Sequence, residues 1–402
     1  MNRIASVADL DVKNKPVFVR VDFNVPLSPN GTITDDTRIR SSLETIRHLL
    51  KQNAKVILAS HMGRPKGKSD LLSLAPCAKR LSELLQKPVK MAPDCIGAEV
   101  QSMCKSLEPG QCLLLENLRF YEAEEAPEKD PEFAKQLASL AEVYVNDAFG
   151  TAHRAHSSTA TMARYFSQKG AGFLLQKEID FLGNALTNPE RPFFAIIGGA
   201  KVSTKLGVLA SLVSKVDVLM LGGAMSYTFL KAKGISTGNS PVEDEMLAKA
   251  QEIMALCEKN SVRLMLPLDV IGATKFDNNA DFRVFDIPPG IADGFEGMDI
   301  GPKTLTEWSR QIQQAKTVLW NGPVGVFEFK NFSKGTFNLA RAIGSLPDAT
   351  TIVGGGDSVA AVQEAKIADR MTHISTGGGA SLEYLEHGTL PGIEALSGTA
   401  RY

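Results

Sequence analysis

Arginine and histidine side chains follow several segments of the first half that have β-strand composition. They are Arg20, Arg38, Arg64, Arg119 and Arg154, together with His61, His153 and His156. Guanidinium groups bind phosphate and carboxylate oxygens through paired hydrogen bonds. Any one arginine could serve a structural ion pair, but five together predict a pocket for a small polyanion. The histidines are assigned to binding and not to proton transfer, because a histidine at a strand end is more often hydrogen-bonded or a source of positive charge.

The second half instead places glycine-rich loops after its strand-like segments. GGAKVSTK (198–205) carries two lysines, and GGGDSVA (354–360) and GGGASLE (377–383) each lead into a helical pattern. Bare backbone at a helix N-terminus, next to an ammonium group, suits phosphate binding. Asp357 could either cap its helix or coordinate Mg²⁺, and from the residues alone we favour the cap.

None of the common nucleotide-binding fingerprints is present. GxGxxG fails because Val359 and Leu382 occupy the final glycine position of the two GGG runs. GRPKGKS (63–69) resembles a Walker A loop, but three residues separate its glycines where four are required, and we expect Pro76 to interrupt the following helix. The HRD and DFG signatures of protein kinases are also absent. The residues alone therefore predict a phosphotransferase of unassigned type.

These residues need a scaffold that brings loops together. Short β-type segments alternate with helical patterns such as 36–51 and 131–140, which predicts βαβ units and parallel sheets. Ligands bind such sheets at the carboxyl ends of the strands, where loops lead into helices. The strand-like segments are 16–24, 55–60, 111–117 and 143–149, followed in the second half by 192–199, 217–223, 263–270, 317–323, 350–356 and 373–379.

The chain has 402 residues, and single hydrophobic cores usually stop growing at about 250–300 residues, so two domains are expected. We predict an α/β fold of two Rossmann-like domains, each a parallel β-sheet flanked by helices. The predicted domains are 1–172 and 191–388, and a hinge helix at 173–190 joins them. A tail at 389–402 is expected to pack back on the first domain.

Composition excludes several classes of protein. The net charge is -1, with 44 Lys and Arg against 45 Asp and Glu, so the basic field of a general nucleic-acid binder is missing. No segment approaches the ~20 apolar residues of a membrane span. The five cysteines form no CxxC pair, and the start of the chain resembles neither a secretory signal nor a transit peptide. We expect a cytoplasmic protein that binds neither nucleic acid nor membranes.

Seven longer motifs occur in order along nearly the whole chain. They are RVDFNVP (20–26), SHMGRP (60–65), LLLENLRF (113–120), DAFGTAHRAHSS (147–158), GGAKVSTK (198–205), WNGPVGVFE (320–328) and GGGDS (354–358). This set resembles the phosphoglycerate kinase family. The resemblance implies a monomeric glycolytic kinase that transfers a phosphoryl group between 1,3-bisphosphoglycerate with ADP and 3-phosphoglycerate with ATP, with Mg²⁺ carried on the nucleotide.

The resemblance also implies roles for individual residues. It places a 3-phosphoglycerate site in the first domain, formed by Asp22, Phe23, Asn24, Arg38, His61, Met62, Gly63, Arg64, Arg119 and Arg154. It places a nucleotide site in the second domain, formed by Lys201, Lys205, Gly297, Asn321, Glu328, Gly355, Gly356, Asp357 and Ser358, with Phe276 as a further adenine-pocket position. Asp357 would lie on the metal side and Glu328 would contact the ribose. Arg38, Lys205 and Gly378 are expected nearest the transferred group.

The attacking group in this reaction is an ionised oxygen in both directions, so no general base is required. Domain closure is expected, because in-line transfer needs close approach and exclusion of water. Two other functions compete: a nicotinamide-dependent dehydrogenase and a non-catalytic, two-lobed anion-binding protein. The dehydrogenase lacks the final glycine of its fingerprint, and the anion-binding protein leaves Lys201, Lys205 and Asp357 without a purpose.

Overall fold

The computed structural model describes residues 4–397 and divides into two compact units. The N-terminal unit is Met1–Asp180 with Thr389–Tyr402, and the C-terminal unit is Phe181–Gly388. Helix α6 (Phe173–Thr187) runs from the first unit into the second. Residues 398–402 of the predicted tail lie outside the described residues, while α14 (Pro391–Ser397) contacts strand β6 of the N-terminal unit.

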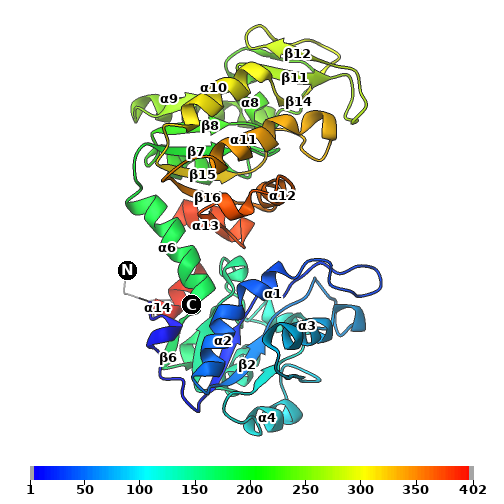
Figure 1. The fold of residues 1–402 in the computed structure, drawn as a ribbon, viewed down its shortest axis with the longest axis vertical. Helices are drawn as coiled ribbons and strands as arrows, with labels where there is room; N and C mark the ends of the chain where they lie inside the picture. The colour runs from blue at the N-terminus through cyan, green and yellow to red at the C-terminus, as the bar shows by residue number, and fades with distance from the viewer. Residues whose placement is uncertain (1–3, 398–402) are drawn as a thin grey trace. The chain divides into compact units, whose positions relative to one another are not determined.

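Six parallel strands form the sheet of the N-terminal unit, in the order β3-β4-β2-β1-β5-β6 (Figure 1). The strands are β1 (Pro16–Arg20), β2 (Lys55–Ala59), β3 (Val89–Met91), β4 (Cys112–Leu114), β5 (Val143–Asn146) and β6 (Gln168–Ala171). The helices are α1 (Thr37–Ser41), α2 (Leu43–Lys51), α3 (Ala75–Leu85), α4 (Ala98–Lys105) and α5 (Pro131–Ala138). Because the chain continues from β1 to β2 on one side and returns to β5 on the other, a ligand crevice is expected at the carboxyl ends of β1 and β5.

One face of this sheet is covered by α1, α2 and α3. Ile39, Ile46 and Leu81 on these helices belong to the same core cluster as Val19 on β1 and Val56 on β2. Each fully buried apolar side chain contributes roughly 1.5–3 kcal/mol relative to an exposed one. The cluster therefore fixes the helices on the strands whose ends carry the site.

The predicted helix at 36–51 is two helices in the structure. The backbone N–H of Ser42 donates to the carbonyl of Ile39, three residues back, so the chain tightens there and α1 ends before α2 begins. A second helix expectation was also wrong. Pro76 does not interrupt a helix but lies in the first turn of α3, where its missing N–H costs nothing.

The sheet of the C-terminal unit also has six parallel strands, in the order β10-β8-β7-β15-β16-β17 (Figure 1). Its strand order reverses between β7 and β15. The strands are β7 (Phe193–Ile197), β8 (Val218–Leu221), β10 (Arg263–Met265), β15 (Thr317–Asn321), β16 (Thr350–Gly354) and β17 (His373–Ile374). The helices are α7 (Leu206–Val213), α8 (Met225–Ala232), α9 (Leu247–Lys259), α10 (Pro302–Ile312), α11 (Lys334–Gly344), α12 (Gly356–Glu364) and α13 (Gly378–His387).

Helices cover both faces of this second sheet. Trp308 on α10, Leu339 on α11 and Val362 on α12 share a core cluster with the sheet residues Phe194 and Val318. On the other side, α7 contacts both α9 and α13. The predicted fold class, parallel sheets flanked by helices in a two-part α/β chain, is confirmed.

The predicted single strand at 263–270 is wrong, because it is divided between two sheets. Its first part is β10, and its last part begins β11 (Asp269–Ala273), which pairs in antiparallel fashion with β12 (Phe282–Asp286) and β14 (Glu296–Ile300). Pro267 lies between the two parts, and a proline cannot donate a hydrogen bond to a ladder. A small parallel pair, β9 (Ser236–Thr237) with β13 (Gly290–Ile291), completes the unit.

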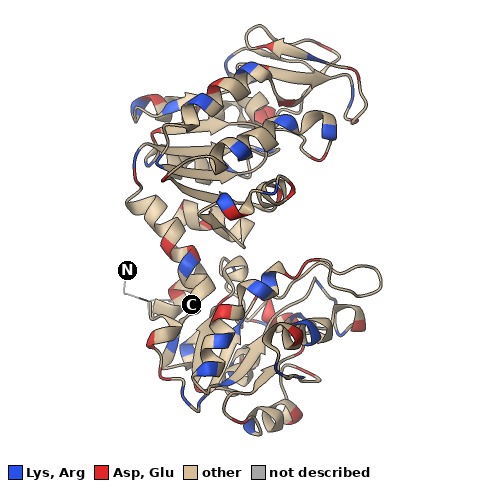
Figure 2. Cartoon of the chain, in the orientation of Figure 1, with Lys and Arg blue, Asp and Glu red and all other residues tan. Residues whose placement is uncertain are grey.

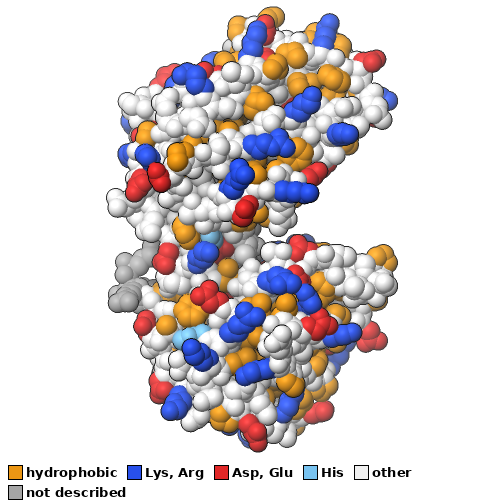
Figure 3. Space-filling model, in the orientation of Figure 1, with side chains coloured by type: hydrophobic (Ala, Val, Ile, Leu, Met, Phe, Trp, Pro, Cys, Tyr) orange, Lys and Arg blue, Asp and Glu red, His pale blue; other side chains and the backbone are white. Residues whose placement is uncertain are grey.

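None of the helices in the described part of the chain combines the length and the hydropathy that a bilayer span requires. Lys and Arg alternate with Asp and Glu along the outer helices of each unit (Figure 2). The face drawn in Figure 3 likewise mixes both signs of charge over each unit, and no broad basic area is visible there. On this face, any strong positive charge is therefore local.

Asp299 on β14 is a buried carboxyl group of the C-terminal unit. It accepts hydrogen bonds from the backbone N–H groups of Ile300 and Gly335, at 2.9 and 2.7 Å. A Cβ at Gly335 would lie 2.2 Å from Oδ1 of Asp299, so a larger residue would not fit beside it. Burial raises the pKa of Asp299 to about 8, although the two hydrogen bonds act in the opposite direction.

The stability of the Asp299→Asn variant, relative to that of wild type, should increase as pH rises. The folded chain keeps the carboxyl protonated up to about pH 8, whereas the unfolded chain ionises it near pH 4, so wild type loses roughly 1.4 kcal/mol of stability per pH unit between those values. Thermal unfolding of both proteins at about pH 5 and about pH 8 measures the effect. The Tm of the variant minus that of wild type should be higher at about pH 8 than at about pH 5, and an equal difference at both would contradict a protonated Asp299.

Candidate functional site

Asp22 and Arg38 form a partly exposed ion pair at the carboxyl end of β1. Arg38 is the second residue of α1, and its Nη1 lies 3.0 Å from Oδ2 of Asp22. The Arg38 side chain is 38% exposed, whereas that of Asp22 is 10% exposed. The ion pair with the more buried Asp22 therefore fixes the position of Arg38, and part of its guanidinium stays exposed, where it can bind a ligand.

Arg20 belongs to the predicted arginine group, but the structure buries it beneath the site. Its Nε donates to Oγ of Ser158 at 2.7 Å, and Nη2 lies 4.0 Å from Oε1 of the buried Glu124. Glu124 in turn accepts from the Ser158 hydroxyl at 2.6 Å. The arginine thus ties β1 to the 3₁₀ turn η4 (Glu122–Glu124) and to the loop that follows β5, and four arginines remain to meet an anion.

The three histidines of this half-site are neutral at neutral pH. Burial lowers the pKa of His61 well below its usual value, and the positive charges of Arg20 and Arg119 act in the same direction. Burial and Arg20 lower the pKa of His156 to about 3, and burial lowers that of His153. They supply hydrogen bonds and not positive charge, as in the contact of His61 Nδ1 with Nη2 of Arg20 at 3.2 Å.

The loop after β2 is held in place by polar contacts from two other strand ends. Asn24 Oδ1 accepts from the N–H of Gly63 at 2.9 Å, and Asn117 Oδ1 accepts from the N–H of Met62 at 3.1 Å. Nη1 of Arg119 donates to the carbonyl of Gly63 at 2.8 Å. Asn117 was not among the predicted site residues, although its place beside Arg119 in the motif LLLENLRF could have indicated it.

The residues predicted to form the anion site of the N-terminal unit differ in which of their groups a ligand could reach. The side chains of Phe23 and Met62 are buried in the core cluster, so only their backbones can take part. Arg64 is exposed and makes no ion pair with any described residue. Arg119 is buried, and two of its guanidinium nitrogens, Nε and Nη2, have no hydrogen-bond acceptor among the described residues. An anion is the natural partner for such unsatisfied donors.

In the C-terminal unit, Lys205 and Asn321 meet where the strand order reverses. Lys205 follows β7, Asn321 ends β15, and the lysine ammonium donates to the Asn321 side-chain oxygen. Burial lowers the pKa of Lys205 to about 8, partly offset by the charge of Asp357. Nδ2 of Asn321 is buried without an acceptor among the described residues. A positive group and a free donor thus converge at the crevice expected for an α/β sheet.

Two helix N-termini approach each other beside these groups. α12 begins at Gly356 and α13 begins at Gly378. A Cβ at Gly378 would lie 3.1 Å from Cα of Gly355, and Gly355 has a φ of 92°, which favours glycine. Aligned backbone N–H groups at both termini can bind phosphate oxygens. Ser358 supports this loop from within, because its hydroxyl accepts from the N–H of Gly322 at 2.6 Å.

Asp357 does not cap its helix, so the expectation drawn from the residues alone was wrong. Gly355 occupies the cap position, and no side chain makes a cap hydrogen bond there. Asp357 is exposed, which leaves its carboxylate available. Within residues 4–397, no group of three or more His, Cys, Asp or Glu is placed to hold a metal ion. A single carboxylate beside a phosphate loop suits Mg²⁺ that keeps waters and phosphate oxygens as its other ligands.

The other residues predicted to bind the nucleotide come from separate segments of the C-terminal unit. Lys201 and Glu328 are exposed, and the ring of Phe276 is exposed beside that of Phe329, with 5.0 Å between centroids. Gly297 on β14 lies against Tyr227, whose hydroxyl would be 2.1 Å from a Cβ at this position. Glycine is therefore required at Gly297 by packing, whatever its role toward a ligand.

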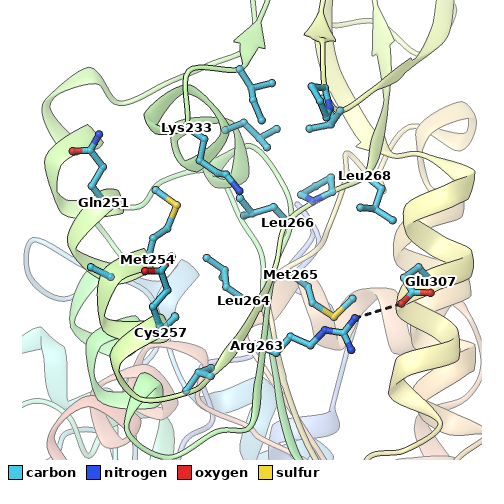
Figure 4. A pocket seen from close by; sticks show the side chains of 18 residues that line it. Lys233, Gln251, Met254, Cys257, Arg263, Leu264, Met265, Leu266, Leu268 and Glu307 are labelled. Atoms are coloured by element: carbon cyan, nitrogen blue, oxygen red, sulfur yellow. Dashed lines mark ion pairs between the residues drawn. The ribbon is translucent and has the colours of Figure 1, made fainter.

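A further hollow of about 850 Å³ lies beside β10, the edge strand of the second sheet (Figure 4). Apolar side chains such as Met254, Leu264 and Leu266 line much of it, and Arg263 pairs with Glu307 there at 3.7 Å. None of the predicted site residues lines this hollow. The candidate site is therefore formed by the strand ends, in one half-site on each unit.

Known proteins resemble this chain over almost its full length. A family model described as phosphoglycerate kinase matches residues 7–388. Phosphoglycerate kinase of Anaeromyxobacter sp. (strain K) is 54% identical over 395 residues, which are 98% of this chain and 99% of that protein. Cytosolic phosphoglycerate kinase of Triticum aestivum is 52% identical over 98% of each chain. The solved phosphoglycerate kinase of Coxiella burnetii is 42% identical with a TM-score of 0.89, covering 99% of this chain and 100% of its own. The resemblance expected from the motifs is confirmed.

The Lys205 ammonium should lose its proton near pH 8, well below the value of about 10.4 for an ordinary lysine. Its positive charge is then complete below that pH and is lost as pH rises through it. Nuclear magnetic resonance of isotopically methylated lysines measures this titration, with Lys205→Arg to assign the signal and the exposed Lys201→Arg as the matched assignment control. A Lys205 signal that titrates together with the bulk of the lysines would contradict the burial effect.

Proposed function

The chain belongs to the phosphoglycerate kinase family of glycolytic phosphotransferases, and we propose that it transfers a phosphoryl group reversibly between 1,3-bisphosphoglycerate with Mg-ADP and 3-phosphoglycerate with Mg-ATP. One observation carries the proposal. The N-terminal unit gathers guanidinium groups, of which that of Arg119 has unsatisfied donors, while the C-terminal unit gathers a lysine and two helix N-termini. The first arrangement suits a small acid, and the second suits a polyphosphate.

We propose that Arg64, Arg119 and Arg154 bind the anionic groups of 3-phosphoglycerate, with Asn24 and His61 as hydrogen-bonding partners. Arg119 supports this role most directly, because its buried Nε and Nη2 lack acceptors. Leaving such a charged donor unsatisfied is costly. Arg38 is assigned to the transferred group because its side chain is partly exposed while its Nη1 is already paired with Asp22.

In the nucleotide half-site, Lys205, Asn321 and the loop Gly355–Gly356 are proposed to hold the phosphates. Asp357 would hold Mg²⁺, which supplies positive charge to the phosphate oxygens when it is bound. The charge of Asp357 raises the pKa of Lys205, in opposition to the effect of burial. Glu328, Gly297 and Phe276 are proposed for the ribose and adenine, and they rest on the family resemblance alone.

The proposed transfer needs no general base. Both attacking groups are already ionised, and the neutral His61 and His156 are surrounded by cations that oppose their protonation. What the chain supplies is fixed charge: Arg38 from one unit, and Lys205 with the α12 and α13 N-termini from the other. Such preorganised charge stabilises the negative equatorial oxygens of the transferring group without reorganisation of water.

Because the two half-sites belong to different units, the proposed transfer requires closure that brings the reacting atoms within about 3–3.5 Å. We assign the hinge to α6. Asp147, which follows β5, accepts from the N–H groups of Leu174 and Leu175 at 2.9 and 3.2 Å, so the start of α6 is fixed to the strand end that precedes the Arg154 loop. We also propose that the protein acts as a cytosolic monomer, as the name of the wheat relative indicates for its compartment.

Arg38→Ala should lower kcat by about 10³-fold, the scale of a single electrostatic group in a transition state, with little change in KM for ATP. A coupled assay with 3-phosphoglycerate and Mg-ATP measures it. Arg40→Ala is the matched control, because Arg40 lies on the same helix but pairs with Asp36 at 2.7 Å. Near-normal turnover of Arg38→Ala would refute its role, and a folded wild-type protein without this activity would refute the proposed function.

Closure should reduce the radius of gyration when both ligands are bound. Small-angle X-ray scattering of the chain with 3-phosphoglycerate and a non-hydrolysable Mg-ATP analogue tests this, with each ligand alone as the comparison. The largest decrease is expected with both ligands, because only then do both half-sites carry the groups that must meet. An unchanged radius with both ligands saturating would contradict closure.

A further inference from the structure

Glu125 lies among the arginines of the N-terminal half-site, although no motif singled it out. Its Oε1 is 2.9 Å from Nη2 of Arg119 and 3.9 Å from Nη1 of Arg154. Both arginines belong to the group that is proposed to bind 3-phosphoglycerate. A carboxylate therefore already occupies the space between two cations that a substrate anion would need.

The contact with Arg119 is close but incomplete. At 2.9 Å the charges are paired, yet the contact lacks hydrogen-bond geometry, and both Nη2 and Nε of Arg119 remain without an acceptor. A phosphate group carries more charge than a carboxylate and presents three acceptor oxygens, so it can satisfy donors that Glu125 leaves unsatisfied. An arriving phosphate should therefore displace Glu125 from Arg119.

Glu125 can also leave without disturbing the fold. It follows η4, whose backbone is fixed by the hydrogen bond from the N–H of Ser157 to the carbonyl of Glu124 and by the burial of Glu124. The Glu125 side chain itself is 46% exposed, against 4% for Arg119. It lines a hollow of about 490 Å³ together with Arg119 and Lys66, into which it can move. The displaced carboxylate then returns to water at small cost.

We propose that Glu125 competes with the acid substrate. In the free protein its carboxylate pairs with the guanidinium groups of Arg119 and Arg154, and this pairing sets the affinity of the half-site for anions. By the same competition, every anion that must displace Glu125 binds more weakly than it would without this carboxylate. The inference rests on the proposed assignment of Arg119 and Arg154 to the acid substrate. Glu125 acts through the arginines and takes no part in the transfer itself.

Glu125→Gln tests the proposal, because it keeps the size of the side chain and removes the competing charge. Glu122→Gln is the matched control, since Glu122 begins η4, which Glu125 directly follows, but pairs with Lys129. Calorimetric titration of each full-length variant with inorganic phosphate should show about two- to fivefold tighter binding for Glu125→Gln only, the range for a half-exposed ion pair. The KM for 3-phosphoglycerate should fall by a similar factor, with kcat and the KM for ATP close to those of the control.

Other outcomes overturn the proposal. Weaker phosphate binding or a raised KM for 3-phosphoglycerate in Glu125→Gln would mean that Glu125 positions Arg119 for the ligand, and no difference from Glu122→Gln would mean that it does not compete. The gain in affinity should also shrink at high ionic strength, because the pair is partly exposed. Phosphate binding needs no turnover, so this arm still decides the role of Glu125 if the assay with 3-phosphoglycerate and Mg-ATP shows no activity.

Discussion

The structure depends on holding buried and partly buried cations at the carboxyl ends of two parallel sheets. Arg20 is the clearest case, because it is buried and is held by Ser158 and the buried Glu124. This arrangement joins three chain segments. Two guanidinium nitrogens of Arg119, Nε and Nη2, have no hydrogen-bond acceptor among the described residues. In the other unit, the burial of Lys205 is only partly offset by the charge of Asp357, and its ammonium donates to Asn321. A desolvated cation without a full set of partners is costly, and an anionic ligand removes that cost.

The same constraint explains the absence of a proton-transfer group from the proposed mechanism. Burial, and next the positive charges of Arg20 and Arg119, lower the pKa values of His61 and His156, so both stay neutral. Neutral imidazoles can hold loops and accept or donate hydrogen bonds, but they add no charge. Reactions between ionised oxygens and a phosphoryl group need charge and position above all. The cluster is therefore suited to phosphoryl transfer, and Glu125 limits how strongly the empty cluster attracts other anions.

Sequence patterns predicted the fold class and the two loop sets, because hydrophobic periodicity reports the strands and strand ends report the site. The predictions from these patterns failed at positions where packing determines the course of the backbone. The single strand predicted at 263–270 splits at Pro267 into two sheets, the helix predicted at 36–51 breaks at Ser42, and Gly355 takes the cap position expected for Asp357. The support given by Asn117, the burial of Arg20 and the position of Glu125 depend on contacts between distant segments. No local pattern contains that information.

If fixed charge alone carries the transfer, no proton moves in the chemical step. The most direct measurement is the single-turnover rate of phosphoryl transfer from Mg-ATP to 3-phosphoglycerate in H₂O and in D₂O, on the part of the pH profile below the titration of Lys205. Equal rates in the two solvents are predicted, because Arg38, Lys205 and the helix N-termini act without exchanging protons with the substrates. A clearly slower rate in D₂O across that range would show that a proton is transferred as the phosphoryl group moves, and would contradict this mechanism.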